Sequence, residues 1–202
     1  MIKRDYKRAE ASYREAASIA EEADDGRIEF TALAALGNLF ASRRNYTDAL
    51  KVFERALPLG PSTANPKAES HLYERVGLVY LGLGEYYQAI GPFERAVAML
   101  RALGEHSCEA HALRNLSETY FKLGNRQEAS KRLREAMQIS LQLMPGWESV
   151  NVDELFDDSG PLWIFRLTSL FMPLNKRFQG NQGLPKVGKK ALVAVSSRLK
   201  LS

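Results

Sequence analysis

The chain has 202 residues, of which 45% are hydrophobic and 26% charged, as in an ordinary soluble protein. No apolar run reaches the 18 or so residues that a membrane span needs, and the first residues lack the apolar core of a signal peptide, so we expect a cytoplasmic protein. A single cysteine, Cys108, excludes an internal disulfide and fits a reducing compartment.

The net charge of +4 is concentrated at the C-terminal end. Residues 145–202 hold eight basic and five acidic side chains, so the preceding part of the chain is nearly neutral. The basic residues are not interleaved with aromatic ones, as they are in surfaces that bind single-stranded nucleic acid. The charge pattern therefore argues against nucleic acid as a partner.

The first predicted helix covers residues 3–23 and has the pattern of the second helix of a hairpin, with no first helix before it. Either the sequence is truncated, or another element or another chain covers its apolar face, which would allow self-association. We expect Asp24-Asp25-Gly26 to end this helix, with Gly26 in the left-handed conformation. Spacings of three and four put five residues on its apolar face: Tyr6, Ala9, Tyr13, Ala16 and Ala20.

Three hairpins of two helices follow. The first pairs residues 28–43 with 47–57, with Thr47 as the expected N-cap of its second helix, and a loop then runs to about Lys67. The second pairs residues 68–82 with 85–102, where Pro92 predicts a kink near Ile90-Gly91 or a late start of the regular helix. The third pairs residues 107–122 with 126–143 across a turn at Gly124-Asn125.

A constant sequence period links these helices. The alanines of the second helices recur at one interval, at Ala9, Ala49, Ala89 and Ala129, and this period of about 40 lies within the range of about 20–50 residues that is typical of a solenoid. The central copy carries Tyr73, Val76, Gly77 and Tyr80 in its first helix and Ala89, Phe93 and Ala96 in its second. In the flanking copies the corresponding residues are Leu33, Leu36, Gly37, Phe40, Ala49, Phe53 and Ala56, and Leu113, Leu116, Ser117, Tyr120, Ala129, Leu133 and Ala136.

At these positions the chain resembles the tetratricopeptide repeat family, in a long form found in scaffold and adaptor proteins. The resemblance implies an all-α, right-handed superhelix of antiparallel helix hairpins, with seven repeat helices within residues 3–144. Beyond this array we expect an acidic segment and an apolar helix in residues 145–174, then a basic flexible tail in residues 175–202. The apolar stretch 162–172 either caps the last helix of the array or binds a membrane or a partner.

No catalytic motif is found in the sequence. His106, Cys108 and His111 are not spaced to share one helix face, and no cysteine cluster supports a metal site. We therefore expect a protein that is not an enzyme and has no cofactor and no metal.

The first helices of such hairpins are expected to line the concave side of the superhelix. There Asn and Arg offer donors that can hold a peptide backbone or a carboxylate, although a solvated helix face is the alternative for each of them. Ala34 stands where the family's clamp for chaperone C-termini has its first Lys, so we do not predict that partner. The predicted peptide-binding residues are Asn38, His71, Arg75, Leu78, Leu81, His111, Arg114, Asn115, Glu118 and Phe121.

The predicted function is that of an adaptor or scaffold that binds a partner peptide in the concave groove. The alternative is a peripheral membrane or complex-assembly factor that acts through the apolar and basic C-terminal segments, with membrane contact through the tail.

Overall fold

The computed structural model describes residues 2–143 and contains no strand among them. The expected seven helices are present in this part of the chain, which confirms the all-α prediction. The segments predicted in residues 145–174 and 175–202 lie outside the described residues. The helices are α1 (Ile2–Glu22), α2 (Gly26–Ser42), α3 (Tyr46–Ala56), α4 (Pro66–Leu83), α5 (Tyr86–Ala102), α6 (His106–Lys122) and α7 (Arg126–Gln142), with a short 3₁₀ helix, η1 (Leu57–Thr63), between α3 and α4.

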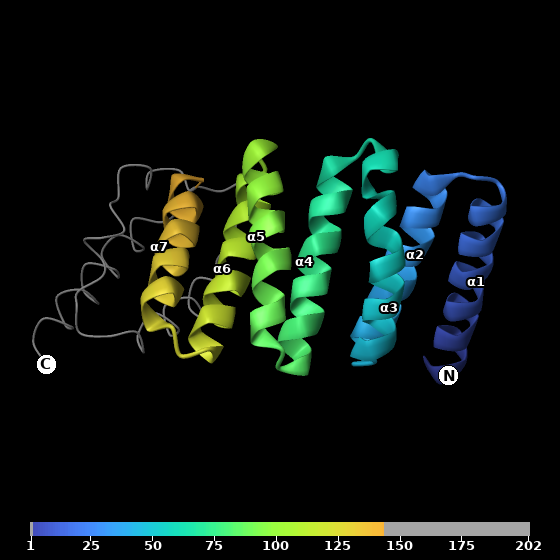
Figure 1. Cartoon of the computed structure of the whole chain (residues 1–202), viewed down its shortest axis with the longest axis horizontal. Helices are drawn as coiled ribbons and strands as arrows, with labels where there is room; N and C mark the ends of the chain where they lie inside the picture. Colours follow the sequence, from blue (N-terminus) through green and yellow to red (C-terminus); the bar gives the residue numbers. More distant parts are fainter. Residues whose placement is uncertain (1, 144–202) are drawn as a thin grey trace, which may run out of the picture. The chain divides into compact units, whose positions relative to one another are not determined.

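The chain divides into two units, residues 1–136 and 137–202, and the packing below is that of the first. In this unit α1 packs on α2, α2 on α3, α4 on α5 and α5 on α6, side by side in chain order (Figure 1). We call α2, α4 and α6 the A helices and α1, α3, α5 and α7 the B helices. The A helices also lie against one another, since α4 contacts both α2 and α6.

In each of the first two hairpins, a glycine of the A helix lies against a phenylalanine of the B helix. A Cβ atom placed on Gly77 would lie 2.8 Å from Cδ1 of Phe93, and Gly37 lies still closer to the ring of Phe53. Phe53 and Phe93 are fully buried, as are the alanines three and four residues away from each of them. The missing side chains of Gly37 and Gly77 therefore let an aromatic ring of the B helix lie directly against the backbone of the A helix.

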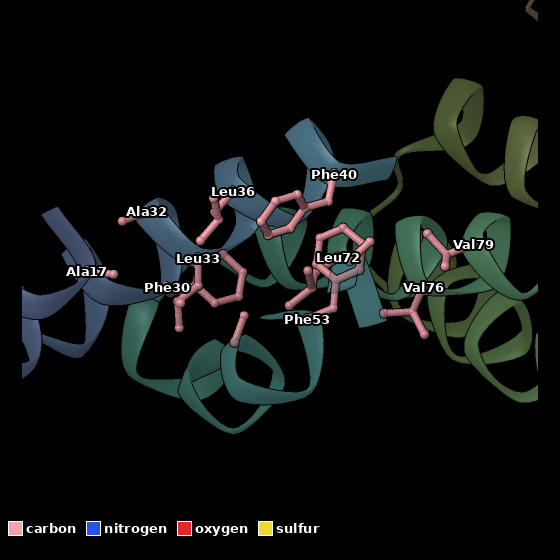
Figure 2. Close-up of a cluster of buried hydrophobic side chains, with 12 residues drawn as sticks. Ala17, Phe30, Ala32, Leu33, Leu36, Phe40, Phe53, Leu72, Val76 and Val79 are labelled. Atoms are coloured by element: carbon pink, nitrogen blue, oxygen red, sulfur yellow. The ribbon is translucent and has the colours of Figure 1, made fainter. Parts of the chain in front are cut away.

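One apolar cluster joins the first hairpin to α4, the first helix of the second hairpin. Figure 2 shows side chains from α2, α3 and α4 gathered in one cluster, with Phe53 between the residues of α2 and those of α4. Burying one large apolar side chain stabilises a fold by about 1.5–3 kcal/mol, so such a cluster joins neighbouring hairpins strongly. Its largest members are Phe30, Leu33, Leu36, Phe40, Phe53, Leu72, Val76 and Val79.

Left-handed backbone conformations recur at a constant interval, half the repeat period, after α1, α2, η1, α4, α5 and α6. In five of the six turns the next residue donates its N–H to a carbonyl five residues earlier, as Asn45 does to Phe40 at 3.0 Å and Glu85 to Tyr80 at 3.0 Å. This is the bond that closes a Schellman motif. The six positions are Asp24, Arg44, Ala64, Gly84, Gly104 and Gly124, with φ between 49° and 81°.

Two of the helix-end predictions are wrong. The left-handed residue after α1 is Asp24, whereas Gly26 is the first residue of α2, because the side chain of Asp25 caps that helix by accepting from the N–H of Ile28. Thr47 lies inside α3, whose N-cap position is Asn45, and there the Asn45 side chain bonds to Asp48 at 2.7 Å.

The segment after α3 is also more regular than predicted, because residues 57–63 form the 3₁₀ helix η1 rather than an open loop. Helix α5 begins at Tyr86 and continues through Pro92, so the alternative of a late helix start is wrong. The kink near Ile90-Gly91 stays a prediction.

Helix α1 differs from the other B helices in how well its apolar face is covered. Tyr13 is 37% exposed, whereas Phe53, the equivalent residue one period later, is 0% exposed. Phe53 is covered by Gly37 of the A helix that precedes it, and no described helix precedes α1. Self-association through this face stays a prediction.

Candidate functional site

The ten predicted binding residues all lie on A helices. Helical spacing places those of each helix on one side, and we call the surface that these sides form the A face. Asn38 is on α2. The residues on α4 are His71, Arg75, Leu78 and Leu81, and those on α6 are His111, Arg114, Asn115, Glu118 and Phe121.

At the centre of the A face a buried carboxylate joins α4 to α6. Glu74 is 6% exposed, and its Oε1 accepts hydrogen bonds from Nδ1 of His111 and, at 3.0 Å, from Nδ2 of Asn115. Nδ1 of His71 lies 3.6 Å from the other carboxylate oxygen. An ionised carboxylate only accepts hydrogen bonds, so Nδ1 of His111 carries the proton in this contact. Two predicted residues, His111 and Asn115, are thus held together by a third side chain.

The surroundings of Glu74 favour its charged form. Burial by itself would raise the pKa of this carboxyl group. The hydrogen bond from His111 and the electrostatic effects of His111, His71 and Arg75 outweigh burial, so the pKa of Glu74 is lowered. The cluster is therefore a hydrogen-bonded bridge between two hairpins.

The remaining predicted residues are open to solvent to different degrees. Arg75 and Glu118 are exposed, and Arg114 is half-buried. Neither arginine forms an ion pair with another residue in the described part of the chain. Leu78 packs against the core cluster of α5 and α6, so it is at least partly a structural residue. The polar groups that can reach a ligand are therefore mainly the arginines rather than Asn115, whose amide is already engaged.

The other predicted residues also differ in how exposed to solvent they are. Asn38 is exposed on α2, whereas Leu81 and Phe121 are half-buried near the C-terminal ends of α4 and α6. Apolar side chains in this state can give a bound peptide a contact area without being part of the closed core. They lie at the opposite end of these helices from the cleft described next.

A cleft of about 590 Å³ opens beside the first half of α2, and the sequence did not predict it. Thr31 and Ala35 line it and lie four residues apart on α2, with Asn38 three residues further along the same side. Its volume is within the range of about 300–1,000 Å³ that is usual for small-molecule pockets. The lining residues are Tyr13 and Ala16 of α1, Arg27, Ile28, Phe30, Thr31, Ala32 and Ala35 of α2, Thr63 of η1, and Asn65 and Ala68 next to or within α4.

Among residues 2–143 no cluster of three potential metal ligands is found. His106 lies near a second buried carboxylate, Glu109, which binds Nε of Arg101 at 2.6 Å. This carboxylate is at the start of α6 and pairs with the end of α5, so it is a link between neighbouring helices. No helix in the described part of the chain has both the length and the apolar character that crossing a membrane would need.

Two family models, both described as tetratricopeptide repeat, match residues 32–64 and 68–142, which together make up more than half of the chain. The chain belongs to the tetratricopeptide repeat family. Tetratricopeptide repeats generally mediate protein–protein interaction and are generally not enzymes. No curated protein matches the chain.

Solved structures show the same type of tetratricopeptide repeat fold. The TPR domain of Arabidopsis FLU is similar with a TM-score of 0.52 and 22% identity, over 55% of this chain and 94% of that one. BtubC (BKLC) from P. vanneervenii is similar with a TM-score of 0.68 and 17% identity, over 90% of this chain and 78% of that one. At these identities the similarity concerns the fold alone.

Proposed function

We propose that this protein is a non-enzymatic adaptor that binds an extended or helical segment of a partner protein along its A face. The observation that carries this proposal is that Arg75 and Arg114 stand on that face without an ion pair among the described residues. Guanidinium groups have five N–H donors and bind carboxylates or backbone carbonyls in a planar, bidentate way. Arginines that form no ion pair among the described residues can use these donors to contact a ligand.

The other residues of the A face divide into two roles in this proposal. Leu81 and Phe121, both half-buried, offer apolar contact, and Asn38 offers an exposed amide. His111 and Asn115 act indirectly, because their hydrogen bonds to Glu74 fix α4 against α6 and so set the spacing of the groups that touch the ligand. This arrangement corresponds to recognition of a peptide in a groove built on rigid helices.

Site-specific photo-cross-linking in cells tests the proposal. A photoreactive amino acid replaces Glu118, which is exposed on the A face, and in a control protein it replaces Lys131, which is exposed on α7. We expect a protein adduct specific to position 118, identified by mass spectrometry. Charge reversal at Arg75 and Arg114 should abolish this adduct, and the same reversal at the exposed Arg126 should leave it unchanged. The proposal fails if the adduct survives the first pair of substitutions.

The alternative, a membrane or assembly factor that acts through residues 145–202, depends on residues outside the described part. Liposome flotation separates it from the adaptor. If the full chain floats with anionic vesicles and a chain that ends at Met144 does not, the C-terminal segment is the active part. The adaptor proposal predicts that neither protein floats.

A further inference from the structure

The charges of helix α1 are ordered along its length. Residues 2–11 of the sequence include four basic and two acidic residues, whereas residues 12–22 include one basic and three acidic ones. A helix dipole favours the reverse order, with acidic side chains near the N-terminus and basic side chains near the C-terminus. The order therefore does not stabilise α1 by itself, whereas an antiparallel helix with the same order would complement it.

The side of α1 that faces away from α2, which we call the outer face, carries both signs of charge. Ala17 and Ala20 are each 3% exposed and mark the side that packs on α2. Helical spacing puts Arg8, Glu15 and Glu22 on the opposite side, and all three are exposed. Among residues 2–143 none of these three forms an ion pair. The outer face therefore has charges that a neighbouring molecule can pair.

Small and apolar residues lie between and beside these charges. Ala11 is exposed between Arg8 and Glu15, and Ile19, one turn after Glu15, is 59% exposed. A small residue at the centre of a contact lets the axis of a second helix come close. Covering an isoleucine removes apolar surface from water, which favours association. The outer face thus combines charged groups with apolar surface that a packed helix would bury.

We infer that a second copy of this chain covers the outer face, with the two α1 helices antiparallel about a two-fold axis next to Ala11. In this register Arg8 of each copy lies opposite Glu15 of the other, so both ion pairs form together. Pairing Arg8 with Glu22 instead would centre the contact on Glu15 and bring two like charges together. A parallel arrangement would place like charges opposite each other at all three positions. Like charges that face each other across an interface disfavour it, so the first register is the one that the charges select.

This contact is small and is separate from the A face. It uses one helix from each copy, and the A helices α2, α4 and α6 take no part in it. Such a contact belongs to the low end of interface sizes, below about 1,200 Å², where association is weak. We therefore expect a dimer with a Kd of about 10–100 µM, which forms as the protein concentration rises.

Analytical ultracentrifugation of the full chain, from about tenfold below to about tenfold above this Kd, tests the inference. Arg8→Glu or Glu15→Arg alone should raise the Kd at least about tenfold, because each places like charges opposite each other. The two substitutions together should restore the dimer. An equal mixture of the two single variants should form a mixed dimer, because one chain is then acidic and the other basic at both positions. Arg126→Glu, at an exposed position on α7, is the control and should leave the Kd unchanged.

Disulfide trapping in a Cys108→Ser protein checks the register. Ala11→Cys should give a covalent dimer on mild oxidation, because only Cα atoms within about 7 Å can be bridged and position 11 lies next to the axis. Ser18→Cys, two turns away on the same side of α1, should not. Circular dichroism checks that each variant is folded. The inference is overturned by a chain that stays monomeric, by assemblies that grow beyond a dimer, or by a dimer that both charge reversals leave intact or that the double variant does not restore.

Discussion

From the left-handed turns that recur twice in each repeat period we predict that glycine stabilises the protein at these positions, whereas inside a helix it destabilises. Ala64 has φ of 49°, and Gly104, at the equivalent position in the next repeat, has φ of 68°. In this conformation a residue with a Cβ atom is destabilised by roughly 1–2 kcal/mol relative to glycine. Against this, glycine loses backbone entropy worth about 0.5–1 kcal/mol more than alanine does on folding. We therefore expect Ala64→Gly to raise the free energy of unfolding by about 0.5–1 kcal/mol, and Gly104→Ala to lower it by a similar amount.

The effect should come from the backbone alone. A Cβ atom on Gly104 would meet no atom within 4 Å, so Gly104→Ala creates no clash. Ala98→Gly is the matched control, because Ala98 is exposed inside α5 and glycine there should cost about 1 kcal/mol. Urea unfolding followed by circular dichroism measures all three free energies, with the slope m compared to confirm that the unfolding reaction is the same. The reasoning is refuted if Ala64→Gly destabilises the protein as Ala98→Gly does.

Two further predictions concern the hairpin contact and the buried carboxylate. Gly77→Ala should lower the free energy of unfolding in urea by about 1–3 kcal/mol, because the new Cβ atom would press on Phe93. Adding Phe93→Leu to this variant should recover part of the lost stability. Equal stability of Gly77→Ala and wild type would contradict this prediction. Glu74→Gln should destabilise the protein near pH 7. Because folding lowers the pKa of Glu74, its stabilisation is complete above the ordinary glutamate pKa of about 4.3 and is lost as the pH falls through the lower folded value. The difference between wild type and Glu74→Gln should thus shrink in acid, and a constant difference down to pH 3 would contradict the assignment.

The repeated packing could be read from the sequence because each contact recurs with the same spacing. Gly37 and Gly77 stand one period apart, as do the aromatic residues that cover them, so a pattern of residue sizes was enough to align the hairpins. The capping details were less predictable. Thr47 and Asn45 are both good N-cap residues by type, and only the backbone path decides that the helix begins after Asn45.

The A face was predictable as one side of the helices but not as a set of contacts. Helical periodicity places His111 and Asn115 on one side of α6, yet it cannot show that both donate to Glu74, which is 37 and 41 residues away from them. The available signal was that His71 and His111 are equivalent repeat positions, with a glutamate three residues after the first. The cleft could not be predicted, because part of its wall is formed by Tyr13 of a helix that the pattern describes only as an incomplete repeat.

The bridge through Glu74 also determines how rigid the proposed peptide site is. Arg75 directly follows Glu74, and Arg114 directly precedes Asn115, so the backbone segments that carry the two guanidinium groups are tied by the same hydrogen bonds. Thermal motion of one hairpin against the next would otherwise change the distance between these two charges. With the bridge intact, the two cations extend from backbone positions at a constant spacing, so less entropy is lost when a ligand orders them.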